Sequence, residues 1–330
     1  METLLSISIP TFNRANLLNQ QLSWLRRAIR GFEAQCEILV ADNCSTDDTP
    51  KVVEKWQSEF KDVRFQFNRH SKNIGAVRNI AYCIEAANGK YVWTISDDDL
   101  IYDEAIAYVL KNLSHSPNLS LLLLNYSSHF AKTGKVRFNR CFSIEGNGFS
   151  SNGKPLFEHC LEKRGGSGLS LTTALIYRTK LAKQALQDWK LGLDNAFVQL
   201  YWTYYCAVRG GFKVSQENYL ECTAGEHHFT KKPEVFVKSM YADLPAIYVK
   251  LMAEGCNPRI CKGLVLKSFK KIQWPLVLKA LLRHPLFVLN SLLRYLGSIR
   301  RTQPVSFMCA FIVHKIRAKF DPRRIENSNA

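Results

Sequence analysis

The stretch GKYVWTISDDD, residues 89–99, joins an apolar run to three adjacent carboxylates. The run from Tyr91 to Ile95 is rich in aromatic and β-branched residues, which predicts a buried strand. Asn88-Gly89 before it is a turn signal, and Ser96-Asp97-Asp98-Asp99 follows it directly. A buried strand that ends in three acids predicts a polar site at that end of a sheet.

Strand and helix patterns alternate on both sides of this stretch. Short apolar runs predict strands, and apolar residues three and four positions apart predict helices between them. The expected strands cover residues 4–9, 36–41, 63–67, 91–95 and 119–126, and the expected helices cover residues 14–30, 49–60, 73–87 and 106–113. Repeated strand–helix–strand units predict an α/β fold with a mostly parallel sheet and helices on both faces.

Polar clusters stand at the predicted ends of the other strands and at the start of a helix. SIPTFNR (8–14) ends the first strand, VADNCSTDDT (40–49) ends the second, and NIGAVRN (73–79) opens the third helix. Ligands of parallel sheets bind beyond the carboxyl ends of the strands. We therefore expect these clusters to meet at one edge of the sheet.

The three aspartates suit a divalent cation. Adjacent carboxylates repel one another unless a cation lies among them, and oxygen ligands suit Mg²⁺ or Mn²⁺. Such an ion bridges a diphosphate and neutralises the charge of a leaving group. The alternative is a solvated turn in which Asp99 caps a helix that begins near Tyr102. The chain has no phosphate-binding glycine loop of either common type.

The four clusters, in this order and spacing, resemble the family 2 glycosyltransferases, whose GT-A fold is Rossmann-like. The resemblance covers about the first 105 residues well and implies a nucleotide-sugar donor with Mn²⁺ or Mg²⁺. It also implies site residues. The donor nucleotide is expected to contact Pro10, Thr11, Asn13, Arg14, Asp42, Arg78, Asp97 and Asp98. Asn13, Asp42 and Arg78 have plainer alternatives as turn, capping or surface residues, and Asp47 and Asp48 are expected to be caps.

Two departures from the family pattern leave alternatives open. The family commonly has D-x-D-D at the acid cluster, but residue 96 is Ser, so either Asp97 and Asp99 hold the metal or Asp98 and Asp99 do. We expect Asp97 and Asp99, with Asp99 first. The family also has an E-D pair before a helix in its second half, and the matching place holds Leu193-Asp194. Asp194 is the candidate catalytic base, and the alternative is that it caps a helix from Ala196.

The second half of the chain matches more loosely. We expect a long loop over residues 138–168, a strand over residues 169–177 whose start runs beside the acceptor, and a helix over residues 194–208. The stretch after Asp194 resembles bacterial enzymes that add sugars to lipid-linked O-antigen or capsule intermediates, such as abequosyltransferase-like enzymes. The aromatic helix has ordinary core packing as its alternative. Glu226-His227-His228 is expected in a surface loop, with a metal or diphosphate role as the alternative.

The basic character of the chain lies in its C-terminal segment. Of 330 residues, 45 are Lys or Arg and 28 are Asp or Glu, and from Cys256 to Arg324 there are 15 bases and one acid, Asp321. Apolar and basic residues alternate there without a run long enough to span a membrane. This pattern favours helices lying on an anionic membrane surface, with a helical cap on the catalytic domain as the alternative. Nucleic-acid binding is disfavoured because no known binding motif occurs.

These observations predict two regions, a catalytic domain of residues 1–232 and a basic amphipathic helical segment of residues 233–330. Ten scattered cysteines without metal-site spacing, and no signal peptide, predict a cytoplasmic protein at the inner face of the membrane. The predicted function is inverting sugar transfer from a nucleotide-diphosphate donor to a hydroxyl of a glycan, which is expected to be lipid-linked. The alternatives are a non-catalytic nucleotide-sugar-binding or scaffold protein of the same fold, and a nucleotidyltransferase.

Overall fold

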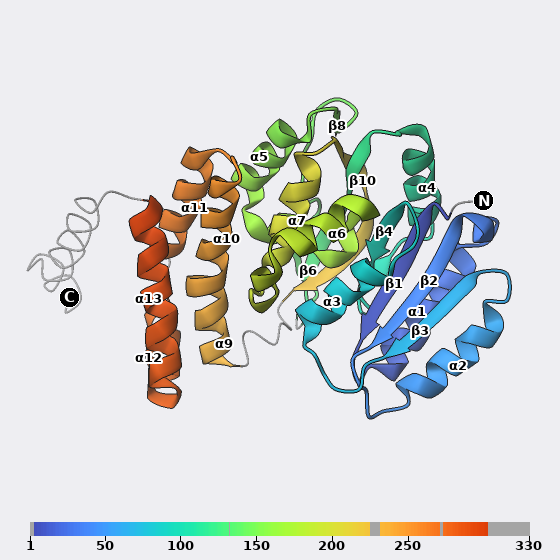
Figure 1. Ribbon diagram of the computed structural model, residues 1–330, viewed down its shortest axis with the longest axis horizontal. Helices are drawn as coiled ribbons and strands as arrows, with labels where there is room; N and C mark the ends of the chain where they lie inside the picture. The colour runs from blue at the N-terminus through green and yellow to red at the C-terminus, as the bar shows by residue number, and fades with distance from the viewer. Residues whose placement is uncertain (1–2, 132, 225–231, 271–272, 303–330) are drawn as a thin grey trace, which may run out of the picture.

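The computed structural model describes residues 3–131, 133–224, 232–270 and 273–302, and its centre is one mixed ten-stranded sheet (Figure 1). The strand order is β3-β2-β1-β4-β9-β6-β10-β5, with β7 beside β6 and β8 beside β10. The strands are β1 (Leu5–Thr11), β2 (Cys36–Asp42), β3 (Arg64–Arg69), β4 (Tyr91–Thr94), β5 (Leu100–Ile101), β6 (Leu119–Phe130), β7 (Val136–Phe138), β8 (Phe149–Ser150), β9 (Leu175–Arg178) and β10 (Gly211–Ala224).

The first four large strands are parallel, and their register brings the expected polar clusters together. Thr11 pairs with Asp42, and Asp42 pairs with Arg69, so β1, β2 and β3 end side by side. Strand β4 lies on the other side of β1, with Thr94 opposite Ser8. The predicted α/β fold is confirmed in this half, and the acid cluster follows β4 at the same edge as the end of β1.

Helices cover both faces of the sheet. Helices α1 (Ala15–Ala28), α2 (Thr49–Glu59) and α4 (Ala105–His115) form one layer, and α3 (Ala76–Ala86), α6 (Thr179–Asp188) and α7 (Val198–Ala207) form the other. Figure 1 shows the second layer in front of the strands. Helix α1 buries one apolar side with Leu18, Leu22 and Leu25, whereas α7 is buried almost all round.

Strand β9 corrects the expected strand over residues 169–177. It covers only Leu175–Arg178 and runs antiparallel to both β4 and β6. The residues before it form two short 3₁₀ helices, Gly166–Leu169 and Thr172–Ala174. The apolar run Leu169–Tyr177 is buried throughout most of its length, and burial alone does not distinguish a strand from a packed turn.

The expected loop over residues 138–168 is also wrong, because it contains strand β8 and a helix, α5 (Gly153–Arg164). Asn152 caps this helix by accepting the backbone N–H of Lys154. Its buried side is narrow and consists of Phe157, Cys160 and Leu161. The helix ends where Gly165 adopts a positive φ of 67°, a conformation that glycine permits.

The expected helix over residues 194–208 begins later than predicted. Residues Lys190–Asp194 form a 3₁₀ helix, η4, and α7 starts at Val198. Trp202, Tyr201 and Tyr204 on α7 are almost completely buried, so the aromatic helix packs as core. Asp194 does not cap α7; the Asn195 side chain instead accepts the N–H of Phe197.

The C-terminal helices form a bundle beside α5 and α7, at the far end from β3 and α2 in Figure 1. They are α9 (Pro233–Lys238), a π-helical turn (Ser239–Asp243), α10 (Leu244–Ala253), α11 (Pro258–Lys270), α12 (Trp274–Arg283) and α13 (Pro285–Thr302). Their buried residues, such as Ile247, Leu251 and Val265, belong to the same continuous core as the sheet. In the described part of the chain no helix combines the length and apolarity needed to cross a bilayer.

One side of α12 and α13 leaves large apolar side chains in solvent. They recur at spacings of three and four residues, through the bend between the two helices. We call this row the apolar ridge, and it consists of Trp274, Leu278, Leu282, Leu286, Leu289, Leu293 and Leu296, each 43–88% exposed. Exposed bases flank it on both helices: Lys279, Arg283, Arg294, Arg300 and Arg301.

Candidate active site

The turns after β1 and β2 are held together by hydrogen bonds through Asn13. Its backbone N–H donates to Ser45 Oγ (2.8 Å), and its side-chain oxygen accepts from Thr46 N (2.7 Å). Asn13 has a positive φ of 52°, which asparagine tolerates better than most residues. The neighbouring strand residue Pro10 is half-buried, and Asp47 accepts from Ala15 N at the start of α1 (2.9 Å). Asn13 thus shapes the turn, and Asp47 is a cap as expected.

Asp42 ends β2 as a completely buried carboxylate. Its Oδ1 accepts from Ser45 N (2.9 Å), and its Oδ2 lies 3.3 Å from Nε of Arg69 without a hydrogen bond in the described residues. A buried acceptor without a hydrogen bond is uncommon and marks a place for a donor group. Because Asp42 is enclosed, a ligand reaches this oxygen only after a neighbouring side chain moves.

The acid cluster is tied to the end of β1 by Thr11 and Arg14. Asp97 accepts from Thr11 Oγ1 and from Arg14 Nη1, each at 2.8 Å, and Arg14 Nη1 also lies 2.8 Å from Asp98 Oδ2. Burial raises the pKa of Asp97, and the contacts with Arg14 and Thr11 oppose that rise. These four residues, all expected at the donor site, are therefore in direct contact.

Asp99 has a different partner, Thr173, which lies in the 3₁₀ turn before β9. The bonds of Thr173 hold this turn against the acid cluster. The Thr173 hydroxyl donates to Asp99 Oδ2 and accepts from Ser96 N (2.9 Å), while Trp93 Nε1 donates to the Thr173 carbonyl (2.7 Å). Burial raises the pKa of Asp99 to about 6, and the charges of Asp98 and Asp97 add to that rise. Asp99 does not cap a helix, because α4 begins at Ala105 after Glu104.

Asp97 and Asp99, the expected metal pair, bond to different side chains in the structure, Asp97 to Thr11 and Arg14 and Asp99 to Thr173. No group of three or more His, Cys, Asp or Glu side chains arranged for a metal occurs in the described residues. Asp97 already has a cationic partner in Arg14. Asp99 has a desolvated carboxylate beside two like charges, with no cationic side chain within ion-pair distance in the described residues. Mg²⁺ sites often use one or two carboxylates, with substrate phosphates and water as the other ligands, and Asp99 fits such a site.

Arg78 and Asp194, which are 116 residues apart, form an ion pair with Nη2 to Oδ1 at 2.7 Å. Arg78 lies in the first turn of α3, which follows Gly75 with its positive φ of 88°. Both side chains are open to solvent, Arg78 at 47% and Asp194 at 76% exposure. A residue expected at the donor nucleotide and the expected catalytic base therefore meet at the surface.

Two adjacent threonines connect Asp99 by hydrogen bonds with the start of α7, the helix that follows Asp194. Thr172, next to Thr173, donates to Oε1 of Gln199 (3.0 Å), which lies in the first turn of α7. The backbone of residues 194–196 is held from the other side by Lys238 and Asp243, in and after α9. Sequence patterns did not reveal Thr173, Gln199, Lys238 or Asp243, because each acts through a partner far away in the chain.

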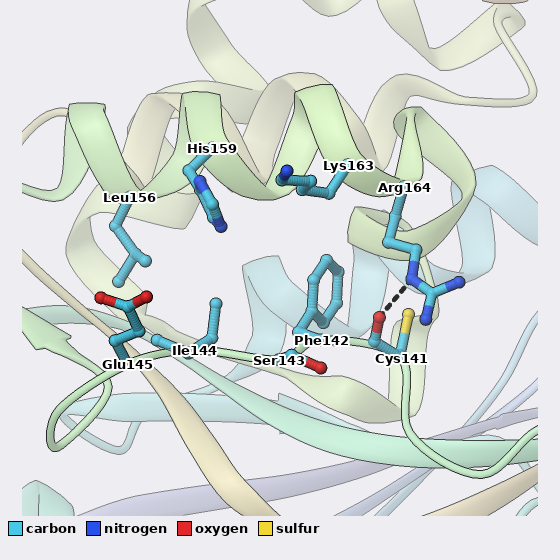
Figure 2. A pocket seen from close by; sticks show the side chains of 9 residues that line it. All are labelled: Cys141, Phe142, Ser143, Ile144, Glu145, Leu156, His159, Lys163 and Arg164. Atoms are coloured by element: carbon cyan, nitrogen blue, oxygen red, sulfur yellow. Dashed lines mark hydrogen bonds between the residues drawn. The ribbon is translucent and has the colours of Figure 1, made fainter.

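Two cavities lie near these residues, but neither contains the acid cluster. The first, about 710 Å³, opens between α5 and the segment 141–145. Figure 2 shows His159, Lys163 and Arg164 of α5 above Phe142, with Glu145 on the opposite rim. The second, about 620 Å³, lies where α1 begins and is lined by Asn13 and Arg14 together with Asp47, Asp48 and neighbouring residues. Glu226-His227-His228 falls outside the described residues.

Comparison with known proteins agrees with this arrangement. Residues 6–179, slightly more than half of the chain, match the family described as glycosyl transferase family 2. Abequosyltransferase RfbV of Salmonella typhimurium is 30% identical over 118 residues, which is 36% of this chain and 35% of that protein. The GalNAc(5)-diNAcBac-PP-undecaprenol β-1,3-glucosyltransferase of Campylobacter jejuni is 31% identical over 111 residues, 32% of this chain and 33% of that protein. The chain thus matches about a third of the length of each relative.

Solved structures extend the fold similarity over almost the whole chain. S. aureus TarS in complex with UDP-GlcNAc has a TM-score of 0.63 at 20% identity and covers 90% of this chain and 82% of its own. The mannosyltransferase PcManGT of Pyrobaculum calidifontis, in complex with GDP-Man and Mn²⁺, has a TM-score of 0.52 at 14% identity, covering 99% and 84%. At these identities the likeness concerns the fold.

Proposed function

Because the chain belongs to glycosyl transferase family 2, we propose that it is an inverting enzyme that moves a sugar from a nucleotide-diphosphate donor to a hydroxyl of a glycan. The observation that carries the proposal is the contact of the acid cluster after β4 with Thr11 and Arg14 at the end of β1. This contact puts acids and a cation at the edge of the parallel strands, where α/β sheets bind ligands.

The donor nucleotide is assigned to the turns after β1 and β2. Thr11, Asn13 and Arg14 follow or end β1, and Asp42 has a carboxylate oxygen without a hydrogen bond for an N–H of the base. Asp97 and Asp98 then face the ribose, and Pro10 lines the same edge. Arg78 carries the fixed positive charge that suits a diphosphate. TarS and PcManGT, which share the fold, were crystallised with UDP-GlcNAc and GDP-Man.

Asp99 is the residue proposed to hold Mn²⁺ or Mg²⁺, with Asp97 as the second candidate. When bound, the cation neutralises charge that develops on the departing diphosphate. The fit rests on the half-buried Asp99 carboxylate, whose neighbours Asp97 and Asp98 are also acidic. Thr173 donates to Oδ2 and so orients the carboxylate. Arg14 keeps Asp97 and Asp98 paired while the donor is absent.

Asp194 is the proposed general base that removes the proton from the acceptor hydroxyl. Inverting transfer needs one such base on the side of the sugar opposite the leaving group. The exposed carboxylate of Asp194 is open to an incoming acceptor, and its only described side-chain partner is Arg78. The C. jejuni relative is named for an undecaprenol-linked glycan, which favours a lipid-linked acceptor here too.

The apolar ridge is proposed to bind an anionic membrane surface from the cytoplasmic side. Leucines and Trp274 beside exposed bases are the composition of helices that lie in the headgroup plane. Each basic residue near an anionic bilayer contributes about 1 kcal/mol of attraction. A second copy of the chain is the competing partner, but no acid occurs from Cys256 to Thr302, so two such surfaces would repel each other.

The first experiment is a binding and hydrolysis panel of UDP-, GDP-, CDP- and TDP-sugars with and without Mn²⁺ or Mg²⁺. We expect one nucleotide class to bind and to be turned over faster with the cation. Asp99→Asn is expected to abolish the cation-dependent turnover, whereas Asp103→Asn, an exposed acid four residues away with no described partner, keeps it. Binding without turnover for any donor would favour the non-catalytic alternative, and no binding at all would refute the proposal.

The membrane part has its own test, vesicle co-sedimentation with phosphatidylglycerol mixed into phosphatidylcholine. Leu282→Asn with Leu286→Asn removes two ridge residues that are 88% and 82% exposed. Leu191→Asn is the matched control, because Leu191 is 83% exposed and lies outside the ridge. We expect only the ridge variant to lose sedimentation. A change in oligomeric state with unchanged vesicle binding would instead assign the ridge to a second copy.

A further inference from the structure

Lys238 ties the C-terminal helices to the segment that carries Asp194. It is the last residue of α9, and its ammonium group donates to the Asp194 carbonyl (2.9 Å) and to Asp243 Oδ2 (2.5 Å). Its side chain is only 28% exposed. One ammonium group therefore bridges the backbone of the proposed base and a carboxylate one helical turn further along the chain.

Asp243 holds the next two residues of the same segment. Its Oδ2 accepts from Ala196 N (3.2 Å), and its carbonyl accepts from the Asn195 side chain (2.8 Å). The Asp243 side chain is 1% exposed, and its Oδ1 has no hydrogen bond in the described residues. Three consecutive residues, 194–196, are thus held by Lys238 and Asp243, through a half-buried ion pair and the Asp243 carbonyl.

This arrangement is costly if it serves only to join two parts of the fold. Removing an ion pair from water costs desolvation free energy, and the attraction between the two charges offsets this cost only when the geometry is good. Apolar packing of similar volume is often as stable. Lys250 is a second lysine that pairs with two carboxylates. Its ammonium group lies 3.6 Å from Asp188 and 2.6 Å from Glu254, and it has no described bond to residues 194–196. Of these two lysine–carboxylate pairs, the Lys238–Asp243 pair is the one that contacts the proposed base segment.

We propose that Lys238 and Asp243 are positioning residues, which fix the backbone of residues 194–196 so that the Asp194 carboxylate faces the acceptor. This inference rests on the proposed role of Asp194. The 3₁₀ helix that ends at Asp194 has only five residues, and the side chain is 76% exposed with Arg78 as its ion-pair partner, so its direction is set by its backbone together with Arg78. A catalytic group displaced by about 1 Å loses on the order of 100-fold in rate. The end of α9 and the π-helical turn after it are then part of the proposed active site.

The test compares Lys238→Met with Lys250→Met in the full-length chain. Both lysines are about one quarter exposed and paired with carboxylates, at 28% and 24%. The assay uses the sugar nucleotide of the UDP, GDP, CDP and TDP panel that the wild-type chain hydrolyses fastest. We expect Lys238→Met to lower kcat about 10- to 100-fold while the Kd of the matching nucleoside diphosphate changes less than twofold. Lys250→Met is expected to keep the wild-type kcat.

Two further variants separate positioning from folding. Lys238→Arg keeps a donor that can bond both a carbonyl and a carboxylate, so it is expected to recover part of the lost kcat. Asp243→Asn keeps the shape of the buried side chain but removes its charge, and it should lower kcat as Lys238→Met does; if it fails to fold, Lys238→Met still decides. If Asp194→Asn abolishes turnover but Lys238→Met leaves kcat unchanged, the positioning role is refuted alone. If Asp194→Asn is itself active, the base assignment has failed.

Discussion

Replacing Asp194 by Asn separates the chemistry of the site from its stability. The substitution keeps the side-chain volume and removes the charge that pairs with Arg78. Because that pair is exposed on both sides, at 47% and 76%, its loss should cost between about 0 and 1 kcal/mol of folding free energy. For a chain of this size that is a shift in Tm of only a few degrees, about 2–4 °C at most.

The expected effect on turnover is far larger. A general base contributes roughly 10²- to 10⁴-fold, and each factor of ten corresponds to about 1.36 kcal/mol of activation free energy. We therefore expect Asp194→Asn to raise the barrier by about 3–5 kcal/mol, several times its effect on folding. The measurement is kcat for donor hydrolysis at saturating donor and Mn²⁺, beside a thermal melt of the same sample.

Glu217→Gln is the matched control for this prediction. Glu217 pairs with Arg140 at 3.0 Å, with 73% and 44% exposure, so it has nearly the same geometry as the Asp194 pair. It should show the same small change in Tm and a wild-type kcat. The assignment of Asp194 is refuted if Asp194→Asn keeps more than about a third of the rate, or if Glu217→Gln loses as much.

Other substitutions test neighbouring parts of the site and the fold. Arg78→Ala should raise the donor KM at least tenfold, because it removes a fixed charge proposed to face the diphosphate; Arg140→Ala, whose ion pair is equally exposed, should not. Thr173→Val should destabilise the fold by about 1–3 kcal/mol in chemical denaturation and also lower kcat, since it leaves the half-buried Asp99 carboxylate and the Ser96 N–H without their partner. Gly89→Ala should destabilise the fold by about 1–3 kcal/mol, because an added Cβ would lie 2.7 Å from a backbone nitrogen of β1, whereas Gly263→Ala in α11, with open space around it, should be neutral or stabilising.

The proposed donor side of the site could be predicted because its residues lie at strand ends. Thr11, Asp42 and the acids after β4 each lie within a few residues of a buried strand, and parallel strands bring their carboxyl ends together. The sequence therefore identified both the edge of the sheet and most of the residues at it. It did not predict that Arg14 would bond both Asp97 and Asp98, because that contact depends on side-chain directions 83 and 84 residues apart.

The second half of the fold was harder to predict because its local patterns are ambiguous. Helix α5 lies between glycine-rich flanks and buries a narrow side, so its periodicity is weak. Residues 166–169 and 172–174 form 3₁₀ helices, although the apolar run from Leu169 to Tyr177 suggested a strand. The helix was predicted to start at Asp194, but that residue ends the 3₁₀ helix η4, and α7 starts four residues later. Asp194 therefore does not cap α7, contrary to the alternative interpretation of the sequence.

These differences follow from how each half of the site is held. On the donor side, backbone register fixes the functional residues, and register is encoded by short apolar runs that can be recognised locally. On the acceptor side, Asp194 is placed by Arg78 from the third helix and by Lys238 from the C-terminal bundle, 116 and 44 residues away. No local pattern encodes such contacts, because each requires two finished elements to meet. The family match ends at residue 179, before Asp194, so the proposed base lies in the part of the chain beyond that match.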